Sequence, residues 1–401
     1  MIDILLALYI GIIIGIFTGL IPGVHINLIA SVLTANIAVL YTHITPIQAI
    51  IFIISMSITH TFIDSIPGIY LGAPDPSQFL VALPGHKMFL QGKAHKAVRL
   101  TAIGGLLSLI FSLSLFGAFS LIIDNVYEML QDRIGFILII LTIYLVCSKD
   151  LKSMMMRTGM FLIAGCYGLI ILNMRSLGNP LFHMLSGMFG IAILVESLRS
   201  ESSIAEQDLS DKGDGEARKS LLPSLIASVA GFIAAFLPGF STSQNAVIAS
   251  RIFPGFNEED FLVLVGGLNT SGMIASLSTF FVLERARNGS IIAIQDLIGD
   301  IGMDGLVIII GSVMISGAMA YMLALIISKR AAIVVQKVDP RKLAIAVISS
   351  IAVLSFLFDG IIGITILFFC TCVGLSAKEL GVSKNYLMGC IILPVILFFV
   401  L

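Results

Sequence analysis

Long apolar segments separated by short polar ones run through almost the whole chain. Residues 100–123, 134–146 and 343–357 are clear examples. Such segments approach or exceed the length of about 17 to 25 residues that a helix needs to cross a bilayer. Ten-residue stretches of alternating apolar and polar residues, which are typical of membrane β-barrels, do not occur. The pattern therefore predicts an all-α polytopic membrane protein.

The composition agrees with a protein that has lipid as its main solvent. Of the 401 residues 58% are hydrophobic and 12% are charged, against roughly 25% charged in soluble domains. The net charge is -1, and no basic segment is interleaved with aromatic residues, which argues against a nucleic-acid partner. The first apolar segment lacks the basic start and cleavage site of a signal peptide. We expect a multi-pass protein of the cytoplasmic membrane, with membrane lipids as partners.

One long polar segment divides the chain. Residues 200–220 are rich in charge and lack aromatic residues, a composition typical of a flexible linker. The segments on either side have similar lengths, so the sequence predicts a first repeat at 1–199, a polar cytoplasmic linker at 200–220 and a second repeat at 221–401.

The two halves share an ordered series of motifs. Gly15 and the pair Pro22-Gly23 match Gly231 and Pro238-Gly239 at a constant offset of 216 residues, and the polar residues 57–59 match 269–271 at an offset of 212. Later apolar segments follow in the same order, with 100–123 matching 303–327, 134–146 matching 343–357, and 186–197 matching 388–401. This order indicates an internal repeat.

Charge bias indicates that the second copy is inverted. Residues 86–99 contain Lys87, Lys93, Lys96 and Arg99 without an acid, which places this loop in the cytoplasm. In the second half the strongest basic loop is 328–342, one span later than its counterpart. The repeats therefore have opposite orientations, with the linker inside and both termini outside. Inverted repeats are frequent in secondary transporters, where substrate binds near the membrane midplane between them.

Each Pro-Gly pair predicts a broken or re-entrant helix followed by a new helix start. Proline removes a backbone donor and glycine relaxes the backbone, so the arriving helix should stop. Unpaired N–H groups and the helix dipole at the next helix start favour an anion. A kink or surface loop is the alternative, but its recurrence in both halves favours a site. The predicted substrate-binding residues are Pro22, Gly23, His25, Asn27, Pro238, Gly239, Ser241, Thr242, Ser243, Asn245, Asn269, Thr270 and Ser271.

A second group of polar residues interrupts the apolar segment at 55–68. It contains Ser57, Thr59, His60 and Asp64, and His60 and Asp64 are spaced to share one helix face. An acid within a membrane segment is expensive and is a candidate functional residue. We predict that these four residues couple transport to H+ or Na+. The alternative is a loop at the membrane surface in which both groups are solvated.

The remaining polar residues predict no catalytic chemistry. His183 and Glu196 lie near span ends, where we expect interfacial hydration, and Asp359 is expected to cap a short turn. The five cysteines lie in apolar segments and are expected to pack as small hydrophobes, without a bound metal. No metalloprotease, phosphate-loop or nucleophile motif occurs. The sequence predicts neither an enzyme nor a cofactor beyond a coupling ion.

These features resemble those of a known family. The opening Gly15, Gly19, Pro22 and Gly23, the stretch 84–108, and Pro238-Gly239 resemble the large membrane subunit family of the tripartite tricarboxylate transporters, TctA. The resemblance implies uptake of carboxylates driven by an ion gradient. It also implies two partners, a small membrane subunit and an extracytoplasmic binding protein.

The opening also resembles that of bacterial polyprenyl-phosphate translocases, whose substrate is a lipid-linked anion. Two function predictions follow. The leading one is a secondary transporter that moves a small organic anion, a carboxylate, across the cytoplasmic membrane with H+ or Na+ coupling. The alternative is a flippase for a polyprenyl-phosphate lipid carrier.

Overall fold

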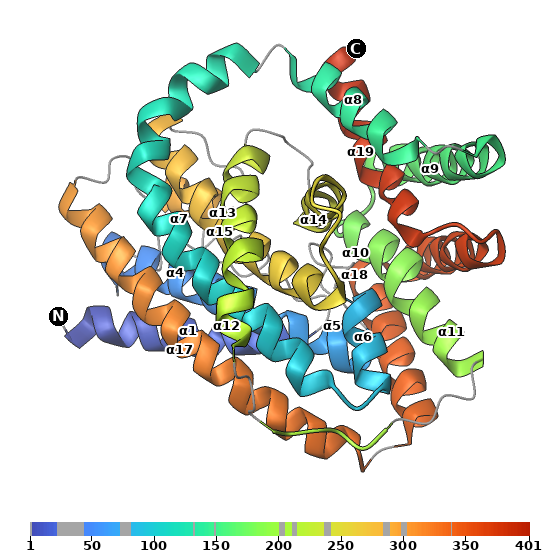
Figure 1. Cartoon of the computed structure of the whole chain (residues 1–401), viewed down its shortest axis with the longest axis horizontal. Coiled ribbons are helices and arrows are strands. Elements are labelled where there is room, and N and C mark those ends of the chain that lie inside the picture. The colour runs from blue at the N-terminus through green and yellow to red at the C-terminus, as the bar shows by residue number, and fades with distance from the viewer. Residues whose placement is uncertain are drawn as a thin grey trace.

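A computed structural model gives the arrangement of the helices (Figure 1). It describes residues 2–21, 44–72, 82–130, 133–147, 150–199, 205–210, 215–235, 242–283, 289–297, 303–337 and 339–401. Within these ranges every regular element is a helix. The prediction of an all-α protein is confirmed.

Seven helices in the described ranges are long and apolar enough to cross a membrane. They are α1 (Ile2–Leu20), α4 (Pro46–Ile63) continued by α5 (Ser65–Leu71), α7 (Ala94–Leu130), α9 (Leu151–Leu172), α15 (Glu258–Leu283), α17 (Met303–Val335) and α18 (Pro340–Glu379). Their number, length and composition agree with the predicted multi-pass membrane protein.

Shorter helices complete the fold. The first half has α6 (Ala82–Leu90), α8 (Ile134–Val146), α10 (Pro180–Leu185), a π-helical turn η3 (Ser186–Ile191) and α11 (Ala192–Arg199). The second half, with the linker, has α12 (Glu216–Lys219), α13 (Leu221–Ala234), α14 (Thr242–Ile252), α16 (Gly289–Leu297), a 3-10 turn η4 (Lys384–Met388) and α19 (Gly389–Val400).

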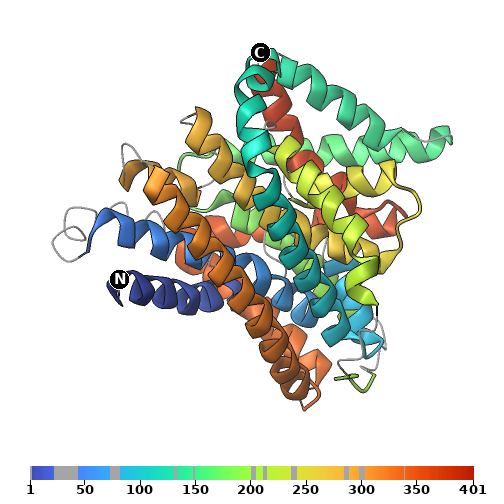
Figure 2. The ribbon, with the colours of Figure 1, turned by 60° about the vertical axis from the view of Figure 1, so that its left-hand side comes forward.

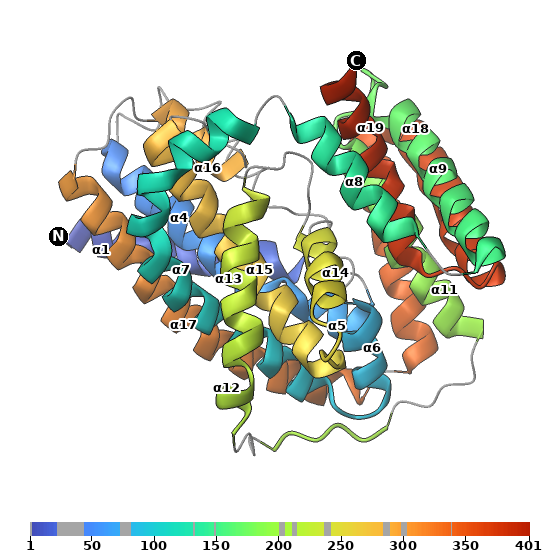
Figure 3. The same cartoon turned by 45° about the horizontal axis from the view of Figure 1, so that its top comes forward.

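Two of the long helices are interior. In the α4–α5 segment 94% of the most apolar window is buried, and in α15 the share is 83%, whereas in the other five it lies between 28% and 33%. Figures 1 and 3 show α7, α13 and α17 around these two helices. The interior pair therefore has little contact with lipid, and polar side chains on it are shielded by protein.

Glycines on α1 bring it close to α4. A Cβ built on Gly15 would lie 2.6 Å from the Met56 carbonyl oxygen and 2.7 Å from the Thr59 Cβ, and Gly11 and Gly19 meet α4 in the same way one turn before and after. Small residues four apart allow helix backbones to approach closely in membranes. The contacts advance together along both helices, so α1 and α4 run parallel, side by side in Figure 2.

The helices α13 and α15 make the corresponding contact in the second half. Gly267 packs against Ala227, and Gly231 packs against Ser271. The residue numbers on α13 exceed those of the equivalent residues on α1 by 216. The residue numbers on α15 exceed those of the equivalent residues on α4 by 212. Both helix pairs therefore share one parallel arrangement and one register.

Each half also covers the interior helix of the other half. The helix α7 packs along α15, and α17 packs along α4. The last helices of each half also pack on the other half. The helix α19 packs on α8 and α9, and the elements α10, η3 and α11 pack on α18. The halves are thus interleaved rather than stacked.

The helix α18 contains a break that divides it into two. Its 40 residues would extend about 60 Å as one helix, roughly twice the apolar thickness of a bilayer. Asp359 (φ -137°) and Gly360 (φ 60°, ψ -144°) depart from helical geometry at the centre. A positive φ is adopted readily by glycine alone, which explains why the break falls at Gly360.

Part of the linker is held firmly, so its interpretation as flexible is wrong for residues 205–210. Asp208 donates its backbone N–H to the Gly92 carbonyl at 2.8 Å, and the Gln207 side chain, only 5% exposed, donates to the Phe89 carbonyl at 2.9 Å. The Gln207 side-chain oxygen also accepts the Ala94 N–H. Local composition misses this because the partners lie more than 100 residues earlier.

The basic residues of α6 and of the start of α7 are paired with acids from the linker and the second half. Arg99 forms two hydrogen bonds of 2.8 Å to the Glu216 carboxylate. Lys87 pairs with Glu258 at 2.5 Å, and Lys96 pairs with Glu259. At this end of the molecule the two halves are therefore joined by opposite charges.

Replacing Gly15 by alanine should destabilise the protein by about 1 to 3 kcal/mol, the usual cost of overpacking a tight contact. The added methyl would meet backbone and Cβ atoms of α4. The melting temperature of the purified protein in detergent measures the effect. The control is Gly117→Ala on α7, where no atom lies within 4 Å of the added methyl. An equal melting temperature in the Gly15 variant and the wild type would contradict the close packing.

Candidate functional site

Local sequence explains why Asp64 lies at a junction between two helices. The helix α4 begins with a capping box between Thr45 and Gln48, with Pro46 at its first position. It ends at Ile63 because Pro67 has no N–H to donate to the Ile63 carbonyl. Asp64 follows, and α5 continues from Ser65.

His60 and Asp64 are buried next to each other. Their side chains are 3% and 2% exposed, and His60 Nε2 lies 3.7 Å from Asp64 Oδ2. The other ring nitrogen of His60 lies 3.1 Å from the Thr18 hydroxyl of α1. The alternative of a solvated surface loop is therefore wrong, because both side chains are buried within the protein.

The helix α15 completes this polar cluster. The Asn269 amide donates to Asp64 Oδ2 at 2.9 Å and to the Thr61 carbonyl at 3.1 Å. The hydroxyls of Thr61 and Thr270 lie 3.2 Å apart. Residues that the sequence assigned separately to ion coupling and to substrate binding thus meet at the contact between the two interior helices.

Two further predicted residues are buried on α4. Ser57 and Thr59 have no exposed surface, and among the described residues their hydroxyl oxygens have no hydrogen-bond partner. A buried polar atom without a partner costs about 1 to 3 kcal/mol. Such atoms in a native structure point to a water or ion that satisfies them.

Other predicted residues hold helices together. The Ser271 hydroxyl donates to the Ala227 carbonyl at 3.0 Å, which joins α15 to α13. The Asn245 amide donates to the Ala230 carbonyl at 2.7 Å, which fixes α14 on α13. Thr242 and Ser243 lie in the first turn of α14.

Seven predicted residues lie outside the described ranges, namely Pro22, Gly23, His25, Asn27, Pro238, Gly239 and Ser241. Their anion-binding role stays a prediction. The chain nevertheless reaches Pro22 from a defined place, because Gly19 packs on Ile63 and on the backbone of Asp64.

The structure also contains a buried group that sequence reasoning missed. His183, which has no exposed surface, lies 2.6 Å from Asp359 Oδ2 and 2.8 Å from the Ser355 hydroxyl. The expected interfacial hydration of His183 is therefore wrong. Asp359 accepts the backbone N–H groups of Gly178 and Asn179, as a residue that caps a turn would.

Glu196 has a protein partner as well. Its carboxylate lies 2.8 Å from Lys384 Nζ, and the Lys384 side chain is 6% exposed. The two residues are 188 positions apart, so no local pattern could reveal the pair.

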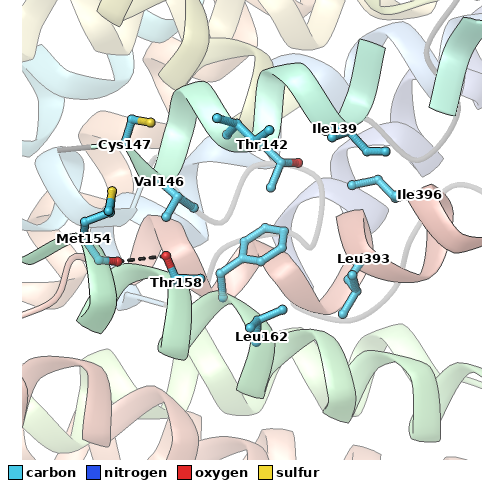
Figure 4. A pocket seen from close by; sticks show the side chains of 11 residues that line it. Ile139, Thr142, Val146, Cys147, Met154, Thr158, Leu162, Leu393 and Ile396 are labelled. Carbon is cyan, nitrogen blue, oxygen red and sulfur yellow. Dashed lines mark hydrogen bonds between the residues drawn. The ribbon is translucent and has the colours of Figure 1, made fainter. Parts of the chain in front are cut away.

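A separate apolar cavity does not suit an anion. It has a volume of about 360 Å³ and lies between α8, α9 and α19, lined by uncharged side chains such as Ile139, Phe161 and Leu393 (Figure 4). The Thr158 hydroxyl on its wall already donates to the Met154 carbonyl. The polar cluster around Asp64 is therefore the stronger candidate site.

Replacing Asn269 by alanine should destabilise the protein by about 1 to 3 kcal/mol, because Asp64 would lose a buried donor. The melting temperature measures the loss, with the exposed Asn173→Ala as the control. In an Asp64→Asn background the same substitution should cost less, since coupled residues are not additive. Equal costs in both backgrounds would contradict the Asp64–Asn269 contact.

Comparison with known proteins shows to which family the chain belongs. A similar protein, an uncharacterized protein of Methanocaldococcus jannaschii, is 32% identical over 357 residues, which cover 87% of this chain and 88% of the relative. No solved structure matches the chain. Residues 5–389 match the tripartite tricarboxylate transporter TctA family. The chain belongs to the TctA family, a family of transporters.

Proposed function

We propose that this protein is the large membrane subunit of a secondary transporter that carries a small organic anion, a carboxylate, with H+ or Na+ as coupling ion. Membership of the TctA family implies a tricarboxylate-type transporter. The observation that carries the coupling assignment is the buried carboxylate of Asp64 between α4 and α15.

A buried carboxylate suits a cation site for an electrostatic reason. Removing a carboxylate from water costs several kcal/mol unless opposite charge or hydrogen bonds compensate. The Asn269 amide supplies a dipole and His60 lies 3.7 Å away. A bound proton or Na+ would neutralise the remaining charge. The hydroxyls of Ser57 and Thr59, which have no hydrogen-bond partner among the described residues, lie one to two turns earlier on α4.

The placement of Asp64 would let cation binding act on both halves. The cluster joins α4 of the first half to α15 of the second. A ligand shifts a conformational equilibrium only through different contacts in the two states. A cation that bridges these helices would favour the state in which they touch, and so link ion binding to the arrangement of the halves.

The anion would bind at the two predicted helix starts, in the residues that follow Pro22-Gly23 and Pro238-Gly239. The matching contacts of α1 with α4 and of α13 with α15 support the repeat, as does the exchange of covering helices. The charge bias of the loops supports its inversion. Under this proposal the starts face each other across the membrane interior.

Family membership also favours two partners, a small membrane subunit and an extracytoplasmic binding protein. A polyprenyl-phosphate flippase is not favoured, because the family match extends over nearly the whole chain. The cytoplasmic membrane is the proposed location.

Replacing Asp64 by asparagine should strongly reduce ion-driven uptake of a labelled tricarboxylate, because the neutral amide cannot take up a proton and lacks the negative charge that attracts Na+. The measurement uses proteoliposomes of the full complex with an imposed Na+ gradient or, separately, an imposed H+ gradient. We expect a loss of at least about tenfold, which corresponds to 1.4 kcal/mol of coupling free energy.

The matched control is Asp124→Asn, the same chemical change at an exposed site on α7. It should retain wild-type uptake. Unchanged uptake in the Asp64 variant would reject the coupling role. Absence of wild-type uptake, together with movement of polyprenyl phosphate between leaflets, would reject the carboxylate substrate.

Cysteines placed at Lys93 and Lys337 should both react with an impermeant maleimide from the cytoplasmic side, since both positions are exposed and lie in loops assigned to the inside. The background replaces the exposed Cys147, Cys166 and Cys372 by serine and keeps the buried Cys370 and Cys390. Labelling of either position from outside in intact cells would contradict the inverted topology.

A further inference from the structure

The fully buried His183 and the partly buried Asp359 join segments that are far apart in the sequence. His183 lies on α10, Asp359 lies at the break of α18, and Ser355 lies one turn earlier on α18. The hydrogen bonds form a chain from the Ser355 hydroxyl through both ring nitrogens of His183 to Asp359 Oδ2. None of these residues contributes to the cluster around Asp64.

Asp359 also ties down the segment that precedes α10. Its Oδ1 accepts the Gly178 N–H at 2.6 Å, and its Oδ2 accepts the Asn179 N–H at 3.0 Å. Hydrogen bonds to an ionised acceptor are roughly twice as strong as neutral ones. The carboxylate therefore fixes both the turn before α10 and the break at Gly360.

The hydrogen bonds can be complete in two protonation states. With a neutral His183, Nε2 donates to Asp359 and Nδ1 accepts from the Ser355 hydroxyl. With a protonated His183, both ring nitrogens donate, and the Ser355 oxygen accepts at the same distance. One proton thus changes the net charge of the pair from -1 to 0 without moving a heavy atom.

Other charged groups near α18 are directed elsewhere. Among the described residues, the titratable side chain in contact with the Asp359 carboxylate is His183. On the elements that contact α18, Glu196 is paired with Lys384 and Lys378. Arg175, between α9 and α10, is exposed. The remaining titratable side chains on α9, α5, η4 and α18 are Lys152, Arg157, Cys166, Tyr167, Tyr70, Tyr386, Arg341, Lys342, Cys370, Cys372 and Glu379.

We propose that His183 and Asp359 form a proton-binding site, separate from Asp64, that locks α10 to the break of α18 when it is occupied. Proton uptake converts a neutral hydrogen-bond donor into a charged one, which strengthens its bond to the carboxylate. The contact between the α10 segment and the break of α18 then becomes tighter. In the topology predicted from charge bias this site lies at the outer side.

Histidine signals in NMR provide a direct test. The full chain, labelled with ¹⁵N-histidine in lipid nanodiscs, has six histidines. The His183 signal is assigned as the one that disappears in the variant His183→Gln. If that variant does not fold, the signal is assigned through Ser355→Ala, which should change the Nδ1 shift of His183 alone. We expect this signal to change from the neutral to the imidazolium form between pH 8 and pH 5.

The change of the His183 signal from the neutral to the imidazolium form should be lost over the same pH range in Asp359→Asn. It should persist in the control Asp124→Asn. It should also persist in Asp64→Asn, so the site can fail or succeed independently of the proposed coupling role. A His183 signal that stays in one form from pH 8 to pH 5 would overturn the proposal. So would an unaltered change in Asp359→Asn, because the proton would then not depend on the pair.

Discussion

Two polar helices cross the interior of this protein almost without touching lipid, and their burial determines where the other long helices lie. The helices α4 and α15 contain an acid, an imidazole, an amide and several hydroxyls. In hydrocarbon each of these groups would be costly unless protein surrounded it. The glycine faces of α1 and α13 cover one side of each helix, and α17 and α7 cover another. The remaining apolar helices are left to face the bilayer.

This arrangement explains which parts of the site can be predicted from the sequence. His60 and Asp64 are four residues apart, so helical periodicity alone places them together. The match between residues 57–59 and 269–271 identifies the polar residues of α15 as a second group. These signals are local or repeated, which makes them visible in one sequence.

The remaining contacts depend on pairing between distant segments. His183 and Asp359 are 176 residues apart, and each taken alone looks like a polar residue at the end of a span. The polar composition of residues 205–210 suggests flexibility, yet the carbonyls of Phe89, Leu90 and Gly92 hold this segment in place. Pairwise burial of this kind leaves no mark on local periodicity or composition.

The exchange of covering helices has a consequence for biosynthesis. The helix α4 ends at Ile63, but the helix that covers it, α17, begins at Met303, about 240 residues later. At about 5 to 20 residues per second, a ribosome needs on the order of 10 to 50 s to synthesise the intervening chain. During that interval Asp64 is inserted without its later neighbours, Asn269 of α15 among them. Nascent chains of this protein must therefore pass through a stage in which a carboxylate is sheltered by the insertion machinery, by protonation or by temporary partners among the first helices.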